Sequence, residues 1–247
     1  MAIGAFFDID GTLLNNPSLE RRFVRHLRYC RLIGVSQWAS WMGFVPITWK
    51  NGLPLGANKR HLRGVPVAAV ESQVSRFLKM DAEHALDPFM IERLYWHQRA
   101  GHRTFLISGS IQLLVGALGD HLRVDAACGT RLEVESGRFT GRLQGPHVYG
   151  AAKLTLLDQL ARLHQVDLSN SFAYANDISD RSFLGGVGHP FAVQPDEQLL
   201  RLAEQSGWPV LLNAGVRLQG SGVRGQGSTN CGLRIADSKR RTLNPDL

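Results

Sequence analysis

The chain has 247 residues, 44% of them hydrophobic and 20% charged, which fits one sizeable globular domain or a core with an inserted lobe. The formal charge of +7 does not indicate a specific nucleic-acid-binding protein, because a Gly- and Ser-rich tail carries a net four of these charges and no recognition motif accompanies them. Three widely spaced cysteines exclude a disulfide framework and a zinc knuckle, and no signal-peptide pattern opens the sequence, so we expect a cytoplasmic location.

The first apolar run, "AIGAFF", reads as a buried strand and ends in two carboxylates, Asp8 and Asp10. Side chains alternate along an extended segment, so these two point to the same side. Like charges repel and lose hydration when buried, and a Mg²⁺ ion removes both penalties because it prefers oxygen ligands. Gly11 and Thr12 then let the backbone turn away close to a ligand. The pattern predicts a metal-assisted site at this strand end.

Residues 15–80 interrupt the core pattern and read as helical, so we expect a lid inserted above the strand ends. Within this segment, residues 32–49 carry no charge and include Trp38, Trp41 and Trp49. Three interpretations stay open: a pair of packed lid helices, an amphipathic contact with a membrane surface, or a membrane span. Polar residues and Pro46 interrupt the stretch, which argues against a span.

A basic segment, "NKRHLRG", follows with Lys59, Arg60, His61 and Arg63. It either reaches an acidic substrate or is a solvated charged run.

Two later apolar runs, "RTFLIS" and "SFAYA", alternate with helical patterns such as residues 151–165, which predicts an open α/β sheet. Polar residues end both runs: Ser108 to Ser110 and Asn176 to Asp180. Ligands bind beyond the carboxyl ends of strands in such sheets, so this coincidence indicates a site. "RLEVESGRFTGRL" predicts a hairpin around Ser136-Gly137 that adds antiparallel strands to the sheet. Residues 213–247 form a basic Gly- and Ser-rich tail that we expect to be disordered.

The motif "DIDGT" resembles the first motif of the haloacid dehalogenase superfamily, and "FLISGS" resembles the second, with Ser108 at the family's Ser/Thr position. Lys153 in "GAAKLTLLDQL" matches the third motif. The stretch "YANDISDRSFLGGVGHPFAVQPDEQLL" resembles the fourth in phosphoserine-phosphatase-like members with a helical cap after motif one, with Asp180 at the final acidic position. The resemblance covers about residues 3–212. It implies a Rossmann-like parallel sheet flanked by helices, formed by residues 1–14 and 81–212, with an inserted helical cap at 15–80.

By this resemblance, Asp8 is the nucleophile, Asp10 the general acid and base, and Lys153 the cation that neutralises phosphate and nucleophile together. Phosphate contacts fall to Ser108, Gly109, Thr12 and Lys153. The Mg²⁺ ligands would be Asp8, Asp10 and a residue at the fourth-motif strand end. Asp180 would support these ligands without binding the ion itself. This chain departs from the family at one ligand, because Asn176 stands where an Asp is usual and Asp177 follows. Either Asn176 binds the metal weakly, or Asp177 takes its place.

The implied activity is a Mg²⁺-dependent phosphatase acting on a small phosphorylated metabolite through an aspartyl-phosphate. Asp10 argues against dehalogenation, because a carbon–halogen bond needs no general acid for its leaving group. Pro17 stands where phosphoserine phosphatases carry a substrate-reading glutamate, with Glu20 three residues later, so phosphoserine itself is in doubt. Two alternatives remain: a catalytically silent phosphate-binding homologue, suggested by Asn176, and a membrane-surface phosphatase of lipid phosphates, suggested by the Trp-bearing lid. The sequence does not indicate an oligomeric state.

Overall fold

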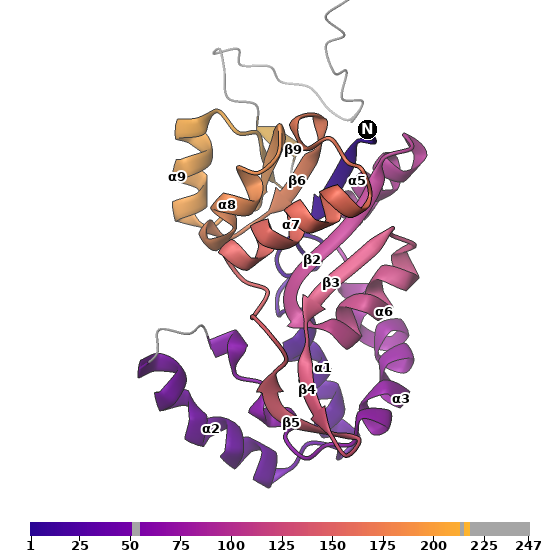
Figure 1. Ribbon diagram of the computed structural model, residues 1–247, viewed down its shortest axis with the longest axis vertical. Coiled ribbons are helices and arrows are strands. Elements are labelled where there is room, and N and C mark those ends of the chain that lie inside the picture. The colour runs from indigo at the N-terminus through magenta and orange to yellow at the C-terminus, as the bar shows by residue number, and fades with distance from the viewer. Residues whose placement is uncertain (51–54, 213–214, 218–247) are drawn as a thin grey trace, which may run out of the picture.

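A seven-stranded sheet forms the upper part of the molecule in Figure 1, which is a computed structural model describing residues 1–50, 55–212 and 215–217. The strand order is β3-β2-β1-β6-β7-β8-β9, and every neighbouring pair is parallel except β8 with β9. The strands are β1 (Gly4–Phe7), β2 (Arg103–Ile111), β3 (Ala126–Thr130), β6 (Phe172–Ala175), β7 (His189–Val193), β8 (Val210–Leu212) and β9 (Gly215–Arg217). The predicted α/β fold is therefore confirmed, and its three predicted strands are neighbours at the centre of the sheet.

Helices cover both faces of the sheet because the central strands are apolar on both sides. Phe6 and Ala173 face one buried cluster, which includes side chains of α7, α8 and α9; Phe7 and Tyr174 face the other, with α5 and α6. The covering helices are α5 (Pro88–Arg99), α6 (Gln112–Leu122), α7 (Ala151–Leu163), α8 (Arg181–Leu184) and α9 (Glu197–Ser206), and the 3₁₀ turns η4 (Leu168–Asn170) and η5 (Ile178–Asp180) flank β6.

The predicted hairpin is present, but its predicted place in the main sheet is wrong. Strands β4 (Leu132–Glu135) and β5 (Arg138–Leu143) form a separate two-stranded sheet. Figure 1 shows this hairpin in the lower lobe, and backbone hydrogen bonds join it there, from Gly64 N to Phe139 O at 2.8 Å and from Val67 N to Gly137 O at 3.0 Å. In Figure 1 the edge strand β3 of the main sheet lies above the hairpin, and the hairpin pairs with the inserted segment below β3.

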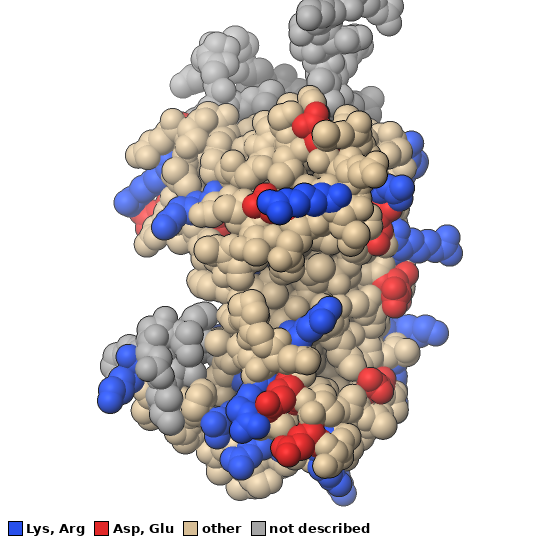
Figure 2. Space-filling model, viewed as in Figure 1, with Lys and Arg blue, Asp and Glu red and all other residues tan. Residues whose placement is uncertain are grey.

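The inserted segment is helical, as expected. Its elements are α1 (Leu19–Tyr29), α2 (Val35–Lys50), the 3₁₀ turns η1 (Leu55–Ala57) and η2 (Arg60–Leu62), and α3 (Val67–Phe77), followed by a π-helical turn η3 (Leu78–Ala82) and α4 (Glu83–Ala85). Figure 2 shows the surface indented on one side between this lobe and the lobe that holds the main sheet. We call the inserted segment the cap.

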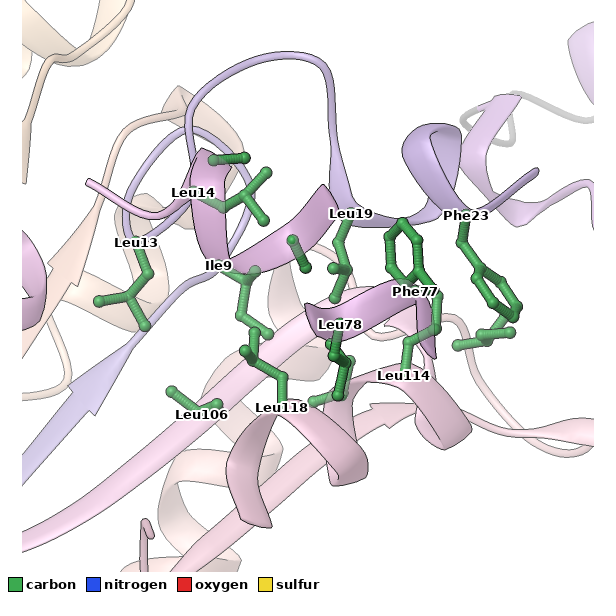
Figure 3. Close-up of a cluster of buried hydrophobic side chains, with 14 of the residues drawn as sticks. Ile9, Leu13, Leu14, Leu19, Phe23, Phe77, Leu78, Leu106, Leu114 and Leu118 are labelled. Carbon is green, nitrogen blue, oxygen red and sulfur yellow. The ribbon is translucent and has the colours of Figure 1, made fainter. Parts of the chain in front are cut away.

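Helix α1 is anchored to the sheet by a continuous apolar cluster (Figure 3). Leu19 and Phe23 of α1 are buried with Phe77 of α3, and the same cluster contains Leu114 and Leu118 of α6. Buried side chains of this kind each contribute about 1.5–3 kcal/mol by leaving water. The cluster therefore fixes the first turn of α1 relative to β1.

The uncharged Trp-bearing stretch forms one helix, α2, rather than the expected pair of packed helices. Among the described residues, no helix is both long and apolar enough to cross a membrane.

Most of the tail that we predicted to be disordered, residues 218–247, lies outside the described residues. The prediction is wrong for Gly215–Arg217, which pair with β8 as strand β9.

Candidate active site

The carboxyl ends of β2, β1 and β6 meet at one edge of the sheet, below which a cavity of about 900 Å³ lies between sheet and cap. The register aligns Phe7 with Leu106 and with Tyr174, so the polar residues that follow these strands meet at one level. Of the predicted site residues, seven line this cavity: Asp8, Asp10, Gly109, Lys153, Asn176, Asp177 and Asp180. Thr12 and Ser108 are buried beside it without lining it.

Lys153 lies between two carboxylates at the sheet side of the cavity. Its Nζ donates to Asp8 Oδ1 at 2.6 Å and to Asp180 Oδ2 at 2.7 Å. All three side chains are buried. Burial by itself would lower the pKa of Lys153, but Asp8 and Asp180 together raise it, so the ammonium stays charged. The cation offsets the loss of hydration of both acids, which explains a lysine in the first turn of α7 despite the helix dipole.

Asp8 is held from both sides. Lys153 donates to one carboxylate oxygen, and the Thr12 hydroxyl donates to the other, Oδ2, at 3.2 Å. The backbone N–H of Asp8 donates to the carbonyl of Tyr174 at 3.0 Å, which continues the ladder between β1 and β6. Thr12, which we predicted to contact phosphate, thus contacts the predicted nucleophile, and its contact with phosphate stays a prediction.

Asp10 faces the start of α1 and the end of β2. Its Oδ1 accepts from the backbone N–H of Leu19 at 2.7 Å, and its Oδ2 accepts from Ser110 Oγ at 3.0 Å. Burial and the neighbouring charge of Asp8 raise the pKa of Asp10 to about 6. A carboxyl group with this pKa can both donate and accept a proton near neutral pH.

The hydroxyl of Ser108 points toward Asp10, at 3.5 Å from Oδ2, and accepts from the backbone N–H of Ser110 at 3.1 Å. Ser110 lines the cavity whereas Ser108 does not. Sequence reasoning named the strand end correctly but not Ser110, because only the bulge in the β2–β3 pairing after Ile107 decides which hydroxyl faces the opening.

Asn176 and Asp177 both line the cavity but differ in their contacts. Oδ1 of Asp177 accepts from the backbone N–H of Ser179 at 2.8 Å and so caps the turn η5. The amide of Asn176 lies against Gly11, where an added Cβ would come within 2.1 Å of Asn176 Nδ2. With φ of +87° and this contact, Gly11 tolerates no side chain. These contacts favour Asn176 as the residue that faces Asp8 and Asp10.

Three cap residues that we had not assigned to the site converge opposite these strand ends. Lys59 Nζ bonds to Glu20 Oε2 in a close ion pair and lies 3.4 Å from the carbonyl of Gly109. His61 Nε2 lies 3.5 Å from the other Glu20 oxygen, and burial lowers the pKa of His61. All three line the cavity. The sequence segment that pointed to Lys59 and His61 was "NKRHLRG". These two side chains are buried against the cavity, whereas Arg63 of the same segment is exposed.

The outer wall of the cavity comes from α1 and α2. Arg21, Arg25 and Arg28 of α1 line it together with Trp38 and Trp41. The Arg28 guanidinium lies over the Trp38 ring, 5.2 Å from its centroid, and the two Trp rings contact edge to face at 5.6 Å. The cap side of the cavity is therefore cationic and aromatic, whereas the sheet side is acidic around one lysine.

Comparisons with known proteins identify the family and the fold. The family model for haloacid dehalogenase-like hydrolases matches residues 5–185. A Mycobacterium tuberculosis protein named a probable phosphatase is 28% identical over 84% of this chain and 74% of its own length. A Neisseria meningitidis histidinol-phosphatase is also 28% identical, over 84% of this chain and 97% of its own length.

Among solved structures, a phospho-aspartyl intermediate analogue of a phosphoserine phosphatase matches with a TM-score of 0.58 and 20% identity, covering 86% of this chain and 93% of that one. This likeness confirms the predicted fold. The family match spans most of the first strand, the cap and the residues of all four motifs. The chain thus belongs to the haloacid dehalogenase-like hydrolase family.

Proposed function

We propose that this protein is a Mg²⁺-dependent phosphatase that hydrolyses a small phosphomonoester through an aspartyl-phosphate on Asp8. The observation that carries the proposal is the contact between Lys153 Nζ and Asp8 Oδ1 at 2.6 Å, on the wall of a cavity large enough for a metabolite. The expected enzyme class agrees with the names of two relatives, a probable phosphatase and a histidinol-phosphatase.

In the first step, an oxygen of Asp8 attacks phosphorus and the bond from phosphorus to the leaving oxygen breaks. Asp10 supplies the proton that the departing alkoxide takes up. In the second step, Asp10 removes a proton from water as the water oxygen attacks phosphorus, and inorganic phosphate leaves with Asp8 restored. The raised pKa of Asp10, about 6, supports both roles, because its two protonation states are both accessible near neutral pH.

Lys153 holds Asp8 and neutralises negative charge on the transferring group, which is where most of the rate enhancement arises. Thr12 fixes the second oxygen of Asp8, and Ser110 holds Asp10. Gly109 lines the cavity at the end of β2, so we assign its backbone to phosphate binding, with Ser108 positioning Asp10 behind it.

The oxygen-rich strand ends fit a magnesium ion. Asp8 and Asp10 offer carboxylates and Asn176 an amide oxygen, and Oδ1 of buried Asp180 has no hydrogen-bond partner within the described part of the chain. No cluster of three His, Cys, Asp or Glu side chains is arranged for a metal among the described residues. Mg²⁺ does not need one, since it binds through one or two carboxylates plus water and substrate phosphate. When bound, Mg²⁺ supplies positive charge to the phosphoryl oxygens.

The substrate class remains a small phosphorylated metabolite. Glu20 is paired with Lys59 and is therefore not free to read an ammonium group, which argues against phosphoserine. The name of one relative, probable phosphatase, gives no substrate, and the other is a histidinol-phosphatase, so names alone do not fix the leaving group. A cytoplasmic location stays a prediction.

The test is phosphate release from a panel of phosphomonoesters with Mg²⁺, for the wild type and Asp8→Asn. We expect the substitution to abolish turnover, because the amide cannot form the covalent intermediate. The matched control is Asp120→Asn, the same change at an exposed position of α6, which should leave turnover unchanged. Retained turnover in Asp8→Asn would rule out the covalent scheme, and no turnover in the wild type would favour the silent phosphate-binding homologue.

A further inference from the structure

Helix α2 has no charged side chain before Lys50, and within the described part of the chain one of its sides is exposed. Residues 32–49 contain no charged side chain, and the first charge after them is Lys50 at the helix end. Figure 1 places α2 at the outer edge of the cap, far from the main sheet.

The inner side of α2 has a partner. Trp38 and Trp41 are half-buried and line the cavity, Asn58 Nδ2 donates to the carbonyl of Trp41 at 3.0 Å, and the Arg60 guanidinium lies 4.0 Å from the Phe44 ring centroid. This side therefore packs on η2 and on the substrate cavity. It accounts for only part of the apolar surface.

The outer side is open to solvent. It presents the exposed residues Val35, Ala39, Met42, Gly43 and Pro46, spaced along one helix face. Val35 is 86% exposed and Met42 is 58% exposed. We call these five residues the outer face of α2. Contiguous exposed apolar residues of this kind mark an interaction site rather than ordinary surface.

The charge around the outer face identifies what covers it. Between Glu20 and Glu71 the sequence contains nine Lys or Arg and no Asp or Glu; three of the nine are paired, Arg22 and Arg25 with Asp81 and Lys59 with Glu20. Arg28 and Arg31, just before α2, are exposed, as is Lys50 at its end. Tyr29, exposed by 84%, stands beside them. An apolar strip with basic residues at both ends can lie on an anionic bilayer, because the apolar side chains enter the interface and the Lys and Arg side chains are attracted to the anionic headgroups.

A second copy of this chain fits the face poorly. A symmetric contact through α2 would bring the Arg28 and Arg31 region and the Lys50 region of two subunits together, with no acidic residue in the segment to pair with them. An anionic lipid surface carries the opposite charge. Charge complementarity therefore selects lipid over self-association.

We propose that the outer face of α2 docks on anionic membrane surfaces, with the helix axis in the interfacial plane. A role in reaching a membrane-borne phosphomonoester rests on the proposed function. The contact is peripheral: α2 lies on the surface and does not span it.

The test is co-sedimentation of the full chain with vesicles of equimolar phosphatidylcholine and phosphatidylglycerol, compared with pure phosphatidylcholine. The variant Val35→Asp/Met42→Asp places two charges on the outer face. The matched control Leu163→Asp/Met80→Asp changes two side chains of similar exposure, 76% and 62%, far from that face. Near-ultraviolet circular dichroism checks that each variant is folded. The readout needs no catalysis, so a failure of the proposed phosphatase activity leaves this test intact.

We expect the wild type and the control to bind anionic vesicles, and the α2 variant to bind at least about tenfold more weakly, because both substituted side chains would otherwise enter the interface. Equal binding by both double variants would assign any affinity to other basic segments and overturn the proposal. So would absence of wild-type binding, or a wild-type dimer in sedimentation that Val35→Asp/Met42→Asp dissociates.

Discussion

Lys153 Nζ is shared between Asp8 Oδ1 at 2.6 Å and Asp180 Oδ2 at 2.7 Å, although these two acids lie 172 positions apart in the sequence. Two buried carboxylates and one ammonium leave one negative charge before substrate or metal enters. The site is therefore prepared for a cation, and a phosphate monoanion or dianion alone would meet repulsion from Asp8.

Replacing the shared cation should cost stability in a pH-dependent way. In Lys153→Met, Asp8 and Asp180 lose their partner, and we expect the free energy of unfolding at pH 8 to fall by about 3–5 kcal/mol. The folded-state pKa of Asp180, already raised by burial to about 6, then rises further because Lys153 no longer lowers it, so the folded state gains protons as pH falls and the loss shrinks at pH 5. Urea unfolding at both pH values measures this. Lys79→Met, at an exposed position, is the control, and an equal loss at both pH values would contradict the account.

Asn176→Asp should tighten Mg²⁺ binding. The amide oxygen of Asn176 carries no formal charge, and a carboxylate there adds one within reach of the ion, which we expect to raise Mg²⁺ affinity roughly tenfold. Isothermal titration with Mg²⁺ measures the affinity directly, without turnover. The same substitution at exposed Asn170 is the control. Unchanged affinity would remove Asn176 from the ligand set and leave Asp177 as the candidate.

The cap pair of Glu20 and Lys59 should tune substrate charge selectivity in opposite directions. Glu20→Gln releases Lys59 from its ion pair, so we expect KM to fall by about tenfold, ~1.4 kcal/mol, for phosphomonoesters whose leaving group is anionic. Lys59→Met should raise KM for the same substrates. Both should leave kcat for a neutral leaving group nearly unchanged.

The double variant Glu20→Gln/Lys59→Met separates charge from structure, because it leaves neither group buried without its partner. KM values that move in the same direction for both single variants would show that the pair supports the cap only and does not face the leaving group.

His97 should make the protein acid-sensitive. It is fully buried, its Nε2 lies 2.8 Å from the Tyr174 hydroxyl, and its Nδ1 lies 2.8 Å from His102 Nδ1. Burial, with His102 and Arg93 nearby, lowers its pKa to about 3. An unfolded histidine binds a proton near pH 6.5, so the unfolded state gains protons first as pH falls, and stability is lost between pH 6.5 and 3.

From pH 7 to pH 5 this amounts to about 2 kcal/mol. The variant His97→Gln should lose this part of the pH dependence, whatever its stability at pH 7, while His84→Gln at an exposed site should keep it. Urea unfolding at pH 7 and pH 5 gives the difference. An unchanged slope in His97→Gln would show that another group controls the acid sensitivity.

The sequence predicted the core strands and the edge at which they meet. Buried strands such as "AIGAFF" and "SFAYA" can be predicted because a short apolar run followed by polar residues is a local pattern in the sequence. Asp8, Lys153 and Asp180 also follow from motif order. By contrast, the hairpin from Leu132 to Leu143 was predicted on the wrong sheet, since a hairpin pattern does not say which surface covers it.

The sequence by itself determined the family, the α/β core and the identity of the acidic and basic groups, because these depend on patterns within short stretches. Only the tertiary structure decided that Ser110 rather than Ser108 opens to the cavity, that Glu20 meets Lys59 across 39 positions, and that one face of α2 stays open. Such choices depend on how the cap packs on the sheet, and packing is decided by long-range contacts that no local pattern encodes.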